Sequence, residues 1–392
     1  MDAFEVLARL AEHGTPPEAD VALRMAVGLD DTLHRFESET LPFISKGGAE
    51  IRFCYGPYGR GKTHLLKAIQ AQANNYGFVT DYIDCGAEYA PFASLADTYR
   101  MIAATALPPN NDDEAGIEAV ISSSRNQRTS TDSLIRALRT EQRLELGFCN
   151  LVIEYLNALE AQNYDLIRTL GSLLTTTPKY HFTMKELYLT YKNLRKPIGK
   201  LSSRKAPLWI RSFCALPSAL NYPGFVILFD ETEKSYHMAK WNIRKRQQRL
   251  ANIRNLVDHV ATGMFSGCAF CFAVVEEFKE FAEKHLEALA QRIERVHPDT
   301  ANPRAIWTSL DELTNPSPDQ SHFFTILGDK IIELAKAAGM QESDADDLRK
   351  SFSDEAYAWA QDIRVGAVRE FVKYAAAVTF RRLYKSPGEA DA

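Results

Sequence analysis

Short apolar runs alternate with longer amphipathic segments along the chain. Apolar runs at 51–55 and 78–84 are each followed by a segment with helical spacing of its apolar residues. The same rhythm returns at 225–229 and 269–275, and 304–310 is a candidate last strand. Strands that alternate with helices are typical of a parallel sheet covered by helices. The pattern therefore predicts an α/β fold built on a parallel sheet.

Helical patterns fill the rest of the chain and interrupt the sheet. Pro108-Pro109 and a polar run open an interruption with amphipathic patterns near 113–122, 131–146, 148–174 and 183–195, and Pro316 and Pro318 mark a second boundary. Proline and polar clusters of this kind separate structural units. The predicted units are an N-terminal helical segment 1–48, a first part of the core 49–107, a helical insertion 108–205, a second part of the core 206–315, and a C-terminal helical lid domain 316–392.

Composition and charge narrow the class of protein. The chain has 392 residues with 46 basic and 51 acidic side chains, a net charge of -5, which does not by itself indicate a nucleic-acid binder. No apolar run reaches the length needed to span a bilayer, so we expect no membrane contact. The N-terminal 14 residues form an amphipathic pattern without the basic start or cleavage site of a signal peptide. We expect a cytoplasmic protein.

Cys268 and Cys271 form a C-x-x-C pair within the apolar run 269–275 and its edge. Residues three apart on a strand point to opposite faces of the sheet. The two thiols are therefore not expected to share a metal ion or a disulfide, and the sequence predicts no metal or redox centre at this pair.

One glycine-rich segment carries the strongest chemical signal. It matches the P-loop pattern G-x-x-x-x-G-K-[ST], follows the strand 51–55 and precedes an amphipathic helix. Glycines let backbone N–H groups approach phosphates, and the lysine and hydroxyl of the pattern reach the β- and γ-phosphates and Mg²⁺. Lys62 is predicted to reach the β- and γ-phosphates, and the hydroxyl of Thr63 is predicted to bind Mg²⁺. The residues predicted to bind ATP or ADP are Gly56, Pro57, Tyr58, Gly59, Arg60, Gly61, Lys62, Thr63 and His64.

Asp230 and Glu231 follow the apolar run 225–229 directly. Ligands of α/β folds bind at the carboxyl edge of the strands, which is where these two acids are expected. Asp230 is predicted to hold Mg²⁺, through water or together with Thr63, and Glu231 to act as general base on the attacking water. The alternative is a plain strand end with solvated acids.

The strand order and the adjacent Asp-Glu pair resemble the AAA+ class of ATPases. The chain is also similar, over nearly its whole length, to the ATP-binding proteins of BREX-type phage-defence systems (the BrxD kind). The run through the P-loop is the specific part of this similarity. The segments that carry it are Gly14-Thr15-Pro16-Pro17, Gly47-Gly48-Ala49-Glu50-Ile51-Arg52-Phe53 with the P-loop, Asp230-Glu231-Thr232-Glu233 with the basic helix after it, Leu289-Ala290-Gln291-Arg292, and Arg369-Glu370-Phe371-Val372.

The resemblance implies an assembly with ATP between subunits, in which a neighbour's arginine stabilises the transferred phosphoryl group. Arg292 and Arg295 follow the fourth strand, where the AAA+ class has this arginine. Arg364 lies where the class has an arginine that acts within the same chain, and Arg369 is the runner-up. The alternative for each is a surface arginine paired with a local acid, namely Glu287, Glu294 or Asp362.

Two basic segments are candidate DNA-binding faces, 192–211 and 240–254. No acid occurs in 187–229 or in 238–257. In the second segment, apolar residues at helical spacing predict one buried stripe with the arginines outside it, a surface suited to a phosphate backbone. That stripe is Ile243, Leu250, Ile253 and Val257. The alternatives are a solvated face or contact with acids of a neighbouring subunit such as Asp344, Asp346 and Asp347.

These features favour an AAA+-type ATPase of a prokaryotic antiviral defence system, with Mg²⁺-dependent ATP hydrolysis coupled to oligomer assembly and to DNA or partner-protein engagement. The alternative is a nucleotide-gated assembly scaffold with little or no turnover. It is favoured by the absence, near Val275 and Glu276, of the polar residue that often follows the fourth AAA+ strand. A small-molecule kinase fits less well, because no acceptor site is evident.

Overall fold

The structure, a computed structural model, describes most of the chain. The sequence-predicted residues Lys240, Arg295 and Arg364 lie outside the part described. The described ranges are 2–14, 18–86, 91–110, 114–125, 130–176, 183–235, 242–293, 307–310, 320–361 and 366–384.

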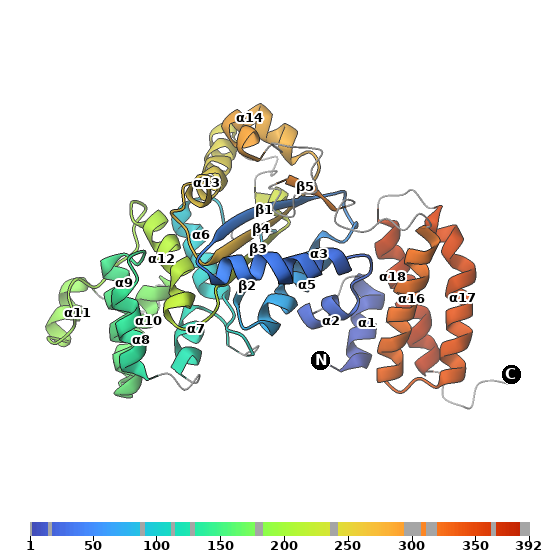
Figure 1. The fold of residues 1–392 in the computed structure, drawn as a ribbon, viewed down its shortest axis with the longest axis horizontal. Helices are drawn as coiled ribbons and strands as arrows, with labels where there is room; N and C mark the ends of the chain where they lie inside the picture. The colour runs from blue at the N-terminus through green and yellow to red at the C-terminus, as the bar shows by residue number, and fades with distance from the viewer. Residues whose placement is uncertain are drawn as a thin grey trace.

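A five-stranded parallel sheet lies at the centre of the molecule (Figure 1). Its order, β2-β3-β4-β1-β5, places β4 between the strand that leads into the P-loop and the strand that ends in Asp230. Because all pairings are parallel, the carboxyl ends of β1 and β3 lie at the same edge. The strands are β1 (Ala49–Tyr55), β2 (Val79–Asp84), β3 (Phe225–Asp230), β4 (Cys268–Val274) and β5 (Trp307–Ser309).

Helices pack on both faces of the sheet, each with its own apolar core. Leu65 and Leu66 of α5 join Cys271 of β4 in one core, whereas Trp209 of α12 and Phe272 of β4 belong to the core of the other face. The helices next to the sheet are α3 (Asp30–Arg35), the π-helical turn η1 (Phe36–Thr40), α4 (Leu41–Ser45), α5 (Lys62–Asn75), α6 (Leu95–Thr105), α12 (Ala206–Ala219), α13 (Ile243–Ala261) and α14 (Phe278–Ile293).

Cys268 and Cys271 lie in different cores, Cys268 with the α12 face and Cys271 with the α5 face. The sequence-based prediction that the two thiols point to opposite faces of a buried strand is therefore confirmed.

Among the described residues, no helix is both long and apolar enough to cross a membrane.

The predicted insertion folds into helices that extend from one side of the sheet (Figure 1). Phe148 of this unit and Trp209 of α12 are in edge-to-face contact, with ring centroids 5.3 Å apart. The insertion therefore shares the core of the α12 face of the sheet. Its helices are α7 (Ile117–Arg125), α8 (Thr131–Thr140), α9 (Leu146–Glu160), α10 (Tyr164–Thr175) and α11 (Met184–Thr190).

The first and last helices of the chain meet in a bundle beside the sheet (Figure 1). Leu7 and Leu10 of the first helix share one apolar core with Ile331 and Phe371 of the last helices. The helices concerned are α1 (Ala3–His13), α2 (Ala19–Arg24), α16 (Gln320–Ala337), α17 (Glu342–Ala360) and α18 (Ala367–Tyr384). The predicted fold class, a P-loop-type parallel sheet flanked by helices with C-terminal helices, is confirmed, whereas the predicted unit boundaries stay a prediction.

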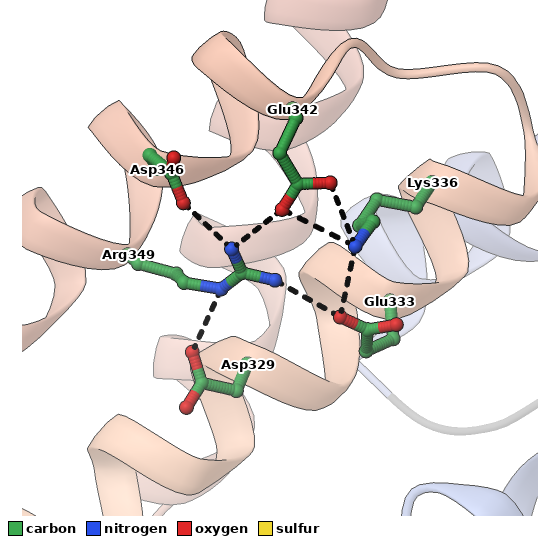
Figure 2. Close-up of polar contacts among 6 residues, drawn as sticks. All are labelled: Asp329, Glu333, Lys336, Glu342, Asp346 and Arg349. Carbon is green, nitrogen blue, oxygen red and sulfur yellow. Dashed lines mark hydrogen bonds and ion pairs between the residues drawn. The ribbon is translucent and has the colours of Figure 1, made fainter.

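Ion pairs join α16 to α17 at one end of this bundle (Figure 2). Arg349 lies 2.8 Å from Asp346, 3.0 Å from both Glu342 and Glu333, and 3.8 Å from Asp329. Lys336 lies 2.9 Å from Glu342. Exposed pairs of this kind contribute up to about 1 kcal/mol each, but a guanidinium shared by four acids fixes how the two helices meet.

Candidate nucleotide-binding site

The P-loop turns between β1 and α5 as the sequence pattern predicts. Gly59 and Gly61 have φ angles of 75° and 102°, which side chains other than glycine rarely adopt. Gly61 directly precedes the first residue of α5, so the backbone N–H groups of that first turn face the loop. A phosphate binds favourably at such a helix end.

Lys62 is buried and bends back over its own loop. Its Nζ donates to the carbonyl oxygens of Gly56 at 2.7 Å and Pro57 at 3.0 Å, and it lies 5.1 Å from the centroid of the Tyr58 ring. Burial lowers the pKa of Lys62, against the opposing charges of Glu233 and Asp230. The ammonium group is thus held where the loop closes, by carbonyls that an anionic ligand would replace as its partner.

Thr63 and Asp230 are brought together from segments far apart in sequence. The Thr63 hydroxyl donates to Oδ2 of Asp230 at 2.6 Å, and Tyr82 of β2 donates to the same oxygen at 2.6 Å. Asp230 is 3% exposed. A hydroxyl and a carboxylate side by side are oxygen ligands of the kind that Mg²⁺ prefers. The two residues predicted as the metal pair are therefore adjacent, and they fit that role.

Glu231 directly follows Asp230 at the same edge of the sheet. Its φ angle is 49°, and its carboxylate pairs with Lys234. A Cβ atom added to Gly86, after the end of β2, would lie 2.4 Å from Oε2 of Glu231. Left-handed backbone at a non-glycine residue is uncommon and often occurs at functional sites. The predicted general base thus lines the cleft while its carboxylate is held by Lys234.

The cleft above the P-loop has apolar walls that the sequence alone did not reveal. One wall comes from the N-terminal segment and the other from the C-terminal bundle. Small-molecule sites are usually mostly apolar with a few polar groups that orient the ligand. The apolar lining residues are Leu10, Met25, Val27, Leu29, Leu310, Phe323, Leu327, Val368 and Val372. The polar ones include the predicted residues from Tyr58 to His64, Asp230 and Glu231, joined by Glu233 and Arg369.

The C-terminal bundle touches the phosphate loop at Gly59. A Cβ atom added to Gly59 would lie 2.7 Å from the Cα atom of Gly366, just before α18. Arg369, one turn into α18, donates to the carbonyl oxygen of His13 at 2.9 Å. Of the two candidate arginines acting in the same chain, Arg369 therefore lines the cleft, while Arg364 lies outside the described residues.

His64 and Arg292 differ in their surroundings. Burial and the charge of Lys67 lower the pKa of His64 to about 4, so this imidazole is neutral at pH 7. Arg292, at the end of α14, pairs with Asp258 of α13 and donates to the carbonyl oxygen of Ala288 at 2.8 Å. It does not line the cleft of its own chain. Its acidic partner is Asp258 rather than Glu287, Glu294 lies outside the described residues, and a role at a neighbour's cleft stays a prediction.

The basic helix α13 is less exposed than the sequence predicts. Arg249 is 9% exposed, so the expectation that the arginines lie outside the buried stripe is wrong at this position. Arg246 lies over the Phe281 ring at 6.0 Å from its centroid, and Arg254 pairs with Asp258. Ile243, expected in the stripe, is 61% exposed. Arg246 is thus turned onto α14 and Arg254 onto an acid of its own helix, and long basic side chains can cover apolar surface with their stems in such positions.

The other basic segment runs exposed between α11 and α12. Arg195 and Lys205 pair with acids of the insertion, Glu154 at 3.9 Å and Glu145 at 2.8 Å. Lys196 lies over the Tyr188 ring, 4.7 Å from its centroid. Within the described ranges, three exposed cations of this segment have no ion-pair partner: Lys192, Lys200 and Arg204.

A family model described as BREX system ATP-binding protein BrxC/D matches residues 2–374. The match extends from the first helix through the P-loop and the Asp-Glu strand into α18. No curated protein matches the chain.

Proposed function

Because this chain belongs to the family of BREX system ATP-binding proteins BrxC/D, which act in phage defence, we propose that it hydrolyses ATP with Mg²⁺ in the cleft above the P-loop. The observation that carries this proposal is the 2.6 Å contact between Thr63 and Asp230, next to the buried Lys62. A contact that served structure alone would not need a threonine hydroxyl, a buried carboxylate and a buried lysine together at the carboxyl edge of the sheet.

In this proposal the protein's own residues bind and orient the triphosphate. Lys62 exchanges the carbonyls of Gly56 and Pro57 for the β- and γ-phosphates, and the N–H groups at the start of α5 bind the same anion. Thr63 and Asp230 would hold Mg²⁺, which offsets the charge that develops on the transferred phosphoryl group. The apolar walls from the N-terminal segment and the C-terminal bundle suit the adenine ring of the nucleotide.

Hydrolysis further requires a group that takes a proton from the attacking water. We assign this role to Glu231, whose carboxylate would have to leave Lys234 to act. We assign to Arg369, which lines the cleft from α18, the role of the arginine that meets the phosphates within the same chain. Arg364 keeps the same proposed role.

Assembly into a homo-oligomer is the second part of the proposal. Arg292 lies away from its own cleft and 40% of its side chain is exposed, as a residue that serves a neighbouring subunit should be. Arg295 shares this proposed role. A non-hydrolysable ATP analogue with Mg²⁺ is expected to increase the mass measured by light scattering from that of one chain to that of an oligomer. An unchanged mass at saturating analogue would contradict assembly driven by ATP.

A nucleotide-gated scaffold with little turnover remains the alternative, and two observations favour it. Glu231 is engaged by Lys234, and β4 ends at Val274 without a polar Asn or Thr at Val275 or Glu276. The scaffold and the ATPase share the binding site and differ only in phosphate release.

We further propose that the exposed segment 192–205, rather than α13, contacts DNA. Lys192, Lys200 and Arg204 have no acid to neutralise them among the described residues. The acids that a contact between subunits would use, Asp344 and Asp347, each lie 2.8 Å from Arg382 of their own chain, and Asp346 is bonded to Arg349. Cations without local partners are suited to phosphates, whose binding releases counterions.

Replacing Lys192, Lys200 and Arg204 together by glutamine is expected to weaken binding to duplex DNA across sequences, by about 10-fold or more at low salt. Each lost phosphate contact should reduce the slope of log affinity against log salt by roughly 0.9. A gel-shift titration at two salt concentrations measures both. The matched control is Arg244→Gln with Lys245→Gln, on the exposed start of α13, which should change affinity less. If the triple variant bound DNA with unchanged affinity and salt dependence, this segment would not be a DNA-binding surface. If the variant lost assembly while its DNA affinity stayed unchanged, the segment would be a protein-binding surface.

A further inference from the structure

Glu233 is a buried acid in the nucleotide cleft with no role in the mechanism above. It is 2% exposed and lines the cleft together with Lys62, Thr63 and Asp230. Its Oε2 atom has no hydrogen-bond partner among the described residues. Buried polar atoms are nearly always partnered, because an unpartnered one costs free energy. A carboxylate kept in this condition next to a ligand cleft therefore points to a role with the ligand.

The turn after β3 explains why Glu233 faces inward. Glu231 adopts its left-handed φ of 49°, and the N–H of Lys234 donates to the carbonyl oxygen of Glu231 at 2.9 Å, which closes the 3₁₀ turn η2 (Thr232–Ser235). The side chains of Glu231 and Lys234 pair on the outside of this turn. Thr232 and Glu233 are left on the buried side, and Glu233 lines the cleft together with the P-loop.

Glu233 and Lys62 compensate each other's charge. Glu233 is the largest electrostatic influence that favours the charged form of Lys62, ahead of Asp230. Burial raises the pKa of Glu233, and the charge of Lys62 opposes that rise. Burial, the charge of Glu233 and a hydrogen bond to it raise the pKa of the Tyr58 phenol to about 12. The phosphate end of the cleft is therefore lined by buried Lys62 together with two buried carboxylates, those of Asp230 and Glu233.

This arrangement sets a condition on the ligand. A triphosphate that arrives without a metal ion brings its negative charge beside the buried carboxylate of Glu233. A triphosphate with bound Mg²⁺ brings the positive charge that offsets this repulsion. We propose that Glu233 makes the cleft select metal-bound nucleotide over metal-free nucleotide. This inference rests on the proposed ATP site and adds a selectivity-determining residue to it.

Glu233→Gln tests the proposal by calorimetric titration of ATP, once with excess Mg²⁺ and once with EDTA. Glutamine keeps the shape of the side chain and removes its charge. The affinity for ATP in EDTA is expected to rise roughly 10- to 100-fold over wild type, as expected when one close like charge in a buried site is removed. In Mg²⁺ the affinity should change less than about threefold, because the metal already offsets that charge.

Glu277→Gln is the matched control, since Glu277 is an exposed acid that also acts on the charge of Lys62. Solvent screens the charge of Glu277, so the affinity of Glu277→Gln for ATP in EDTA should stay near that of wild type. Equal affinities of wild type and Glu233→Gln in EDTA would overturn the inference and leave the ATP site intact. Absence of ATP binding by wild type even in Mg²⁺ would overturn the proposed function itself. Should Glu233→Gln not fold by circular dichroism, Glu233→Ala is measured against the same expectation.

Discussion

Lys62→Ala is expected to lower the affinity for Mg²⁺-ATP at least about 100-fold. The lysine is the buried cation at the closed end of the P-loop, held at 2.7 Å and 3.0 Å from the carbonyl oxygens of Gly56 and Pro57. A charged hydrogen bond contributes about 1.5–3 kcal/mol, and two phosphates would each lose one. Calorimetry or a fluorescent ATP analogue measures the change.

The matched control for this variant is Lys46→Ala. Lys46 is an exposed lysine just after α4, before the start of β1 and so at the opposite end of that strand from the P-loop. Its replacement should leave ATP affinity within about twofold of wild type, since exposed charges far from a site are screened. If folded Lys62→Ala bound Mg²⁺-ATP with wild-type affinity, the segment 56–63 would not be the phosphate-binding loop.

Glu231→Gln is expected to retain ATP and to slow its hydrolysis about 100-fold or more. The amide keeps the side-chain shape but cannot accept a proton, and general-base catalysis typically contributes 10²- to 10⁴-fold. The dissociation constant should change little, because the carboxylate pairs with Lys234 and does not contact Lys62. Steady-state phosphate release and an independent binding titration separate the two quantities.

Glu280→Gln, an exposed acid on α14, is the control for the same chemical change away from the strand edge. It should release phosphate at the wild-type rate. If Glu231→Gln also released phosphate at the wild-type rate, Glu231 would not be the general base. Of the Asp-Glu pair, only Asp230 would then keep a proposed role, as a Mg²⁺ ligand.

The strands and the P-loop were predictable because their signals are local. The apolar run 225–229 became β3 with one added residue, Asp230, and the helix after Gly61 starts at Lys62 as expected. The pattern 148–174 was less informative. It divides into α9 and α10, because Gln162 takes a φ of 53° and the Asn163 side chain caps the second helix by accepting from the N–H of Leu166 at 3.1 Å. The helical spacing of apolar residues continues across this turn, so the spacing alone does not reveal the break between the two helices.

Parts of the site were not predictable because they depend on the contact between the two ends of the chain. No local pattern places Met25 and Val27 opposite Phe323 and Val372, yet these side chains form the walls of one cleft. Glu233 had a weak signal, since it stands in the same Asp-Glu-Thr-Glu run as Asp230. Its burial follows from the turn that the left-handed Glu231 produces, and sequence spacing does not encode that turn.

Phosphate release from ATP by the purified wild-type chain, measured with Mg²⁺ and with or without DNA, is the decisive test of ATP hydrolysis. We expect steady-state turnover that requires Mg²⁺ and is lost in both Lys62→Ala and Glu231→Gln. ATP that binds tightly but releases no phosphate under any of these conditions would contradict hydrolysis and would identify the chain as a nucleotide-gated scaffold.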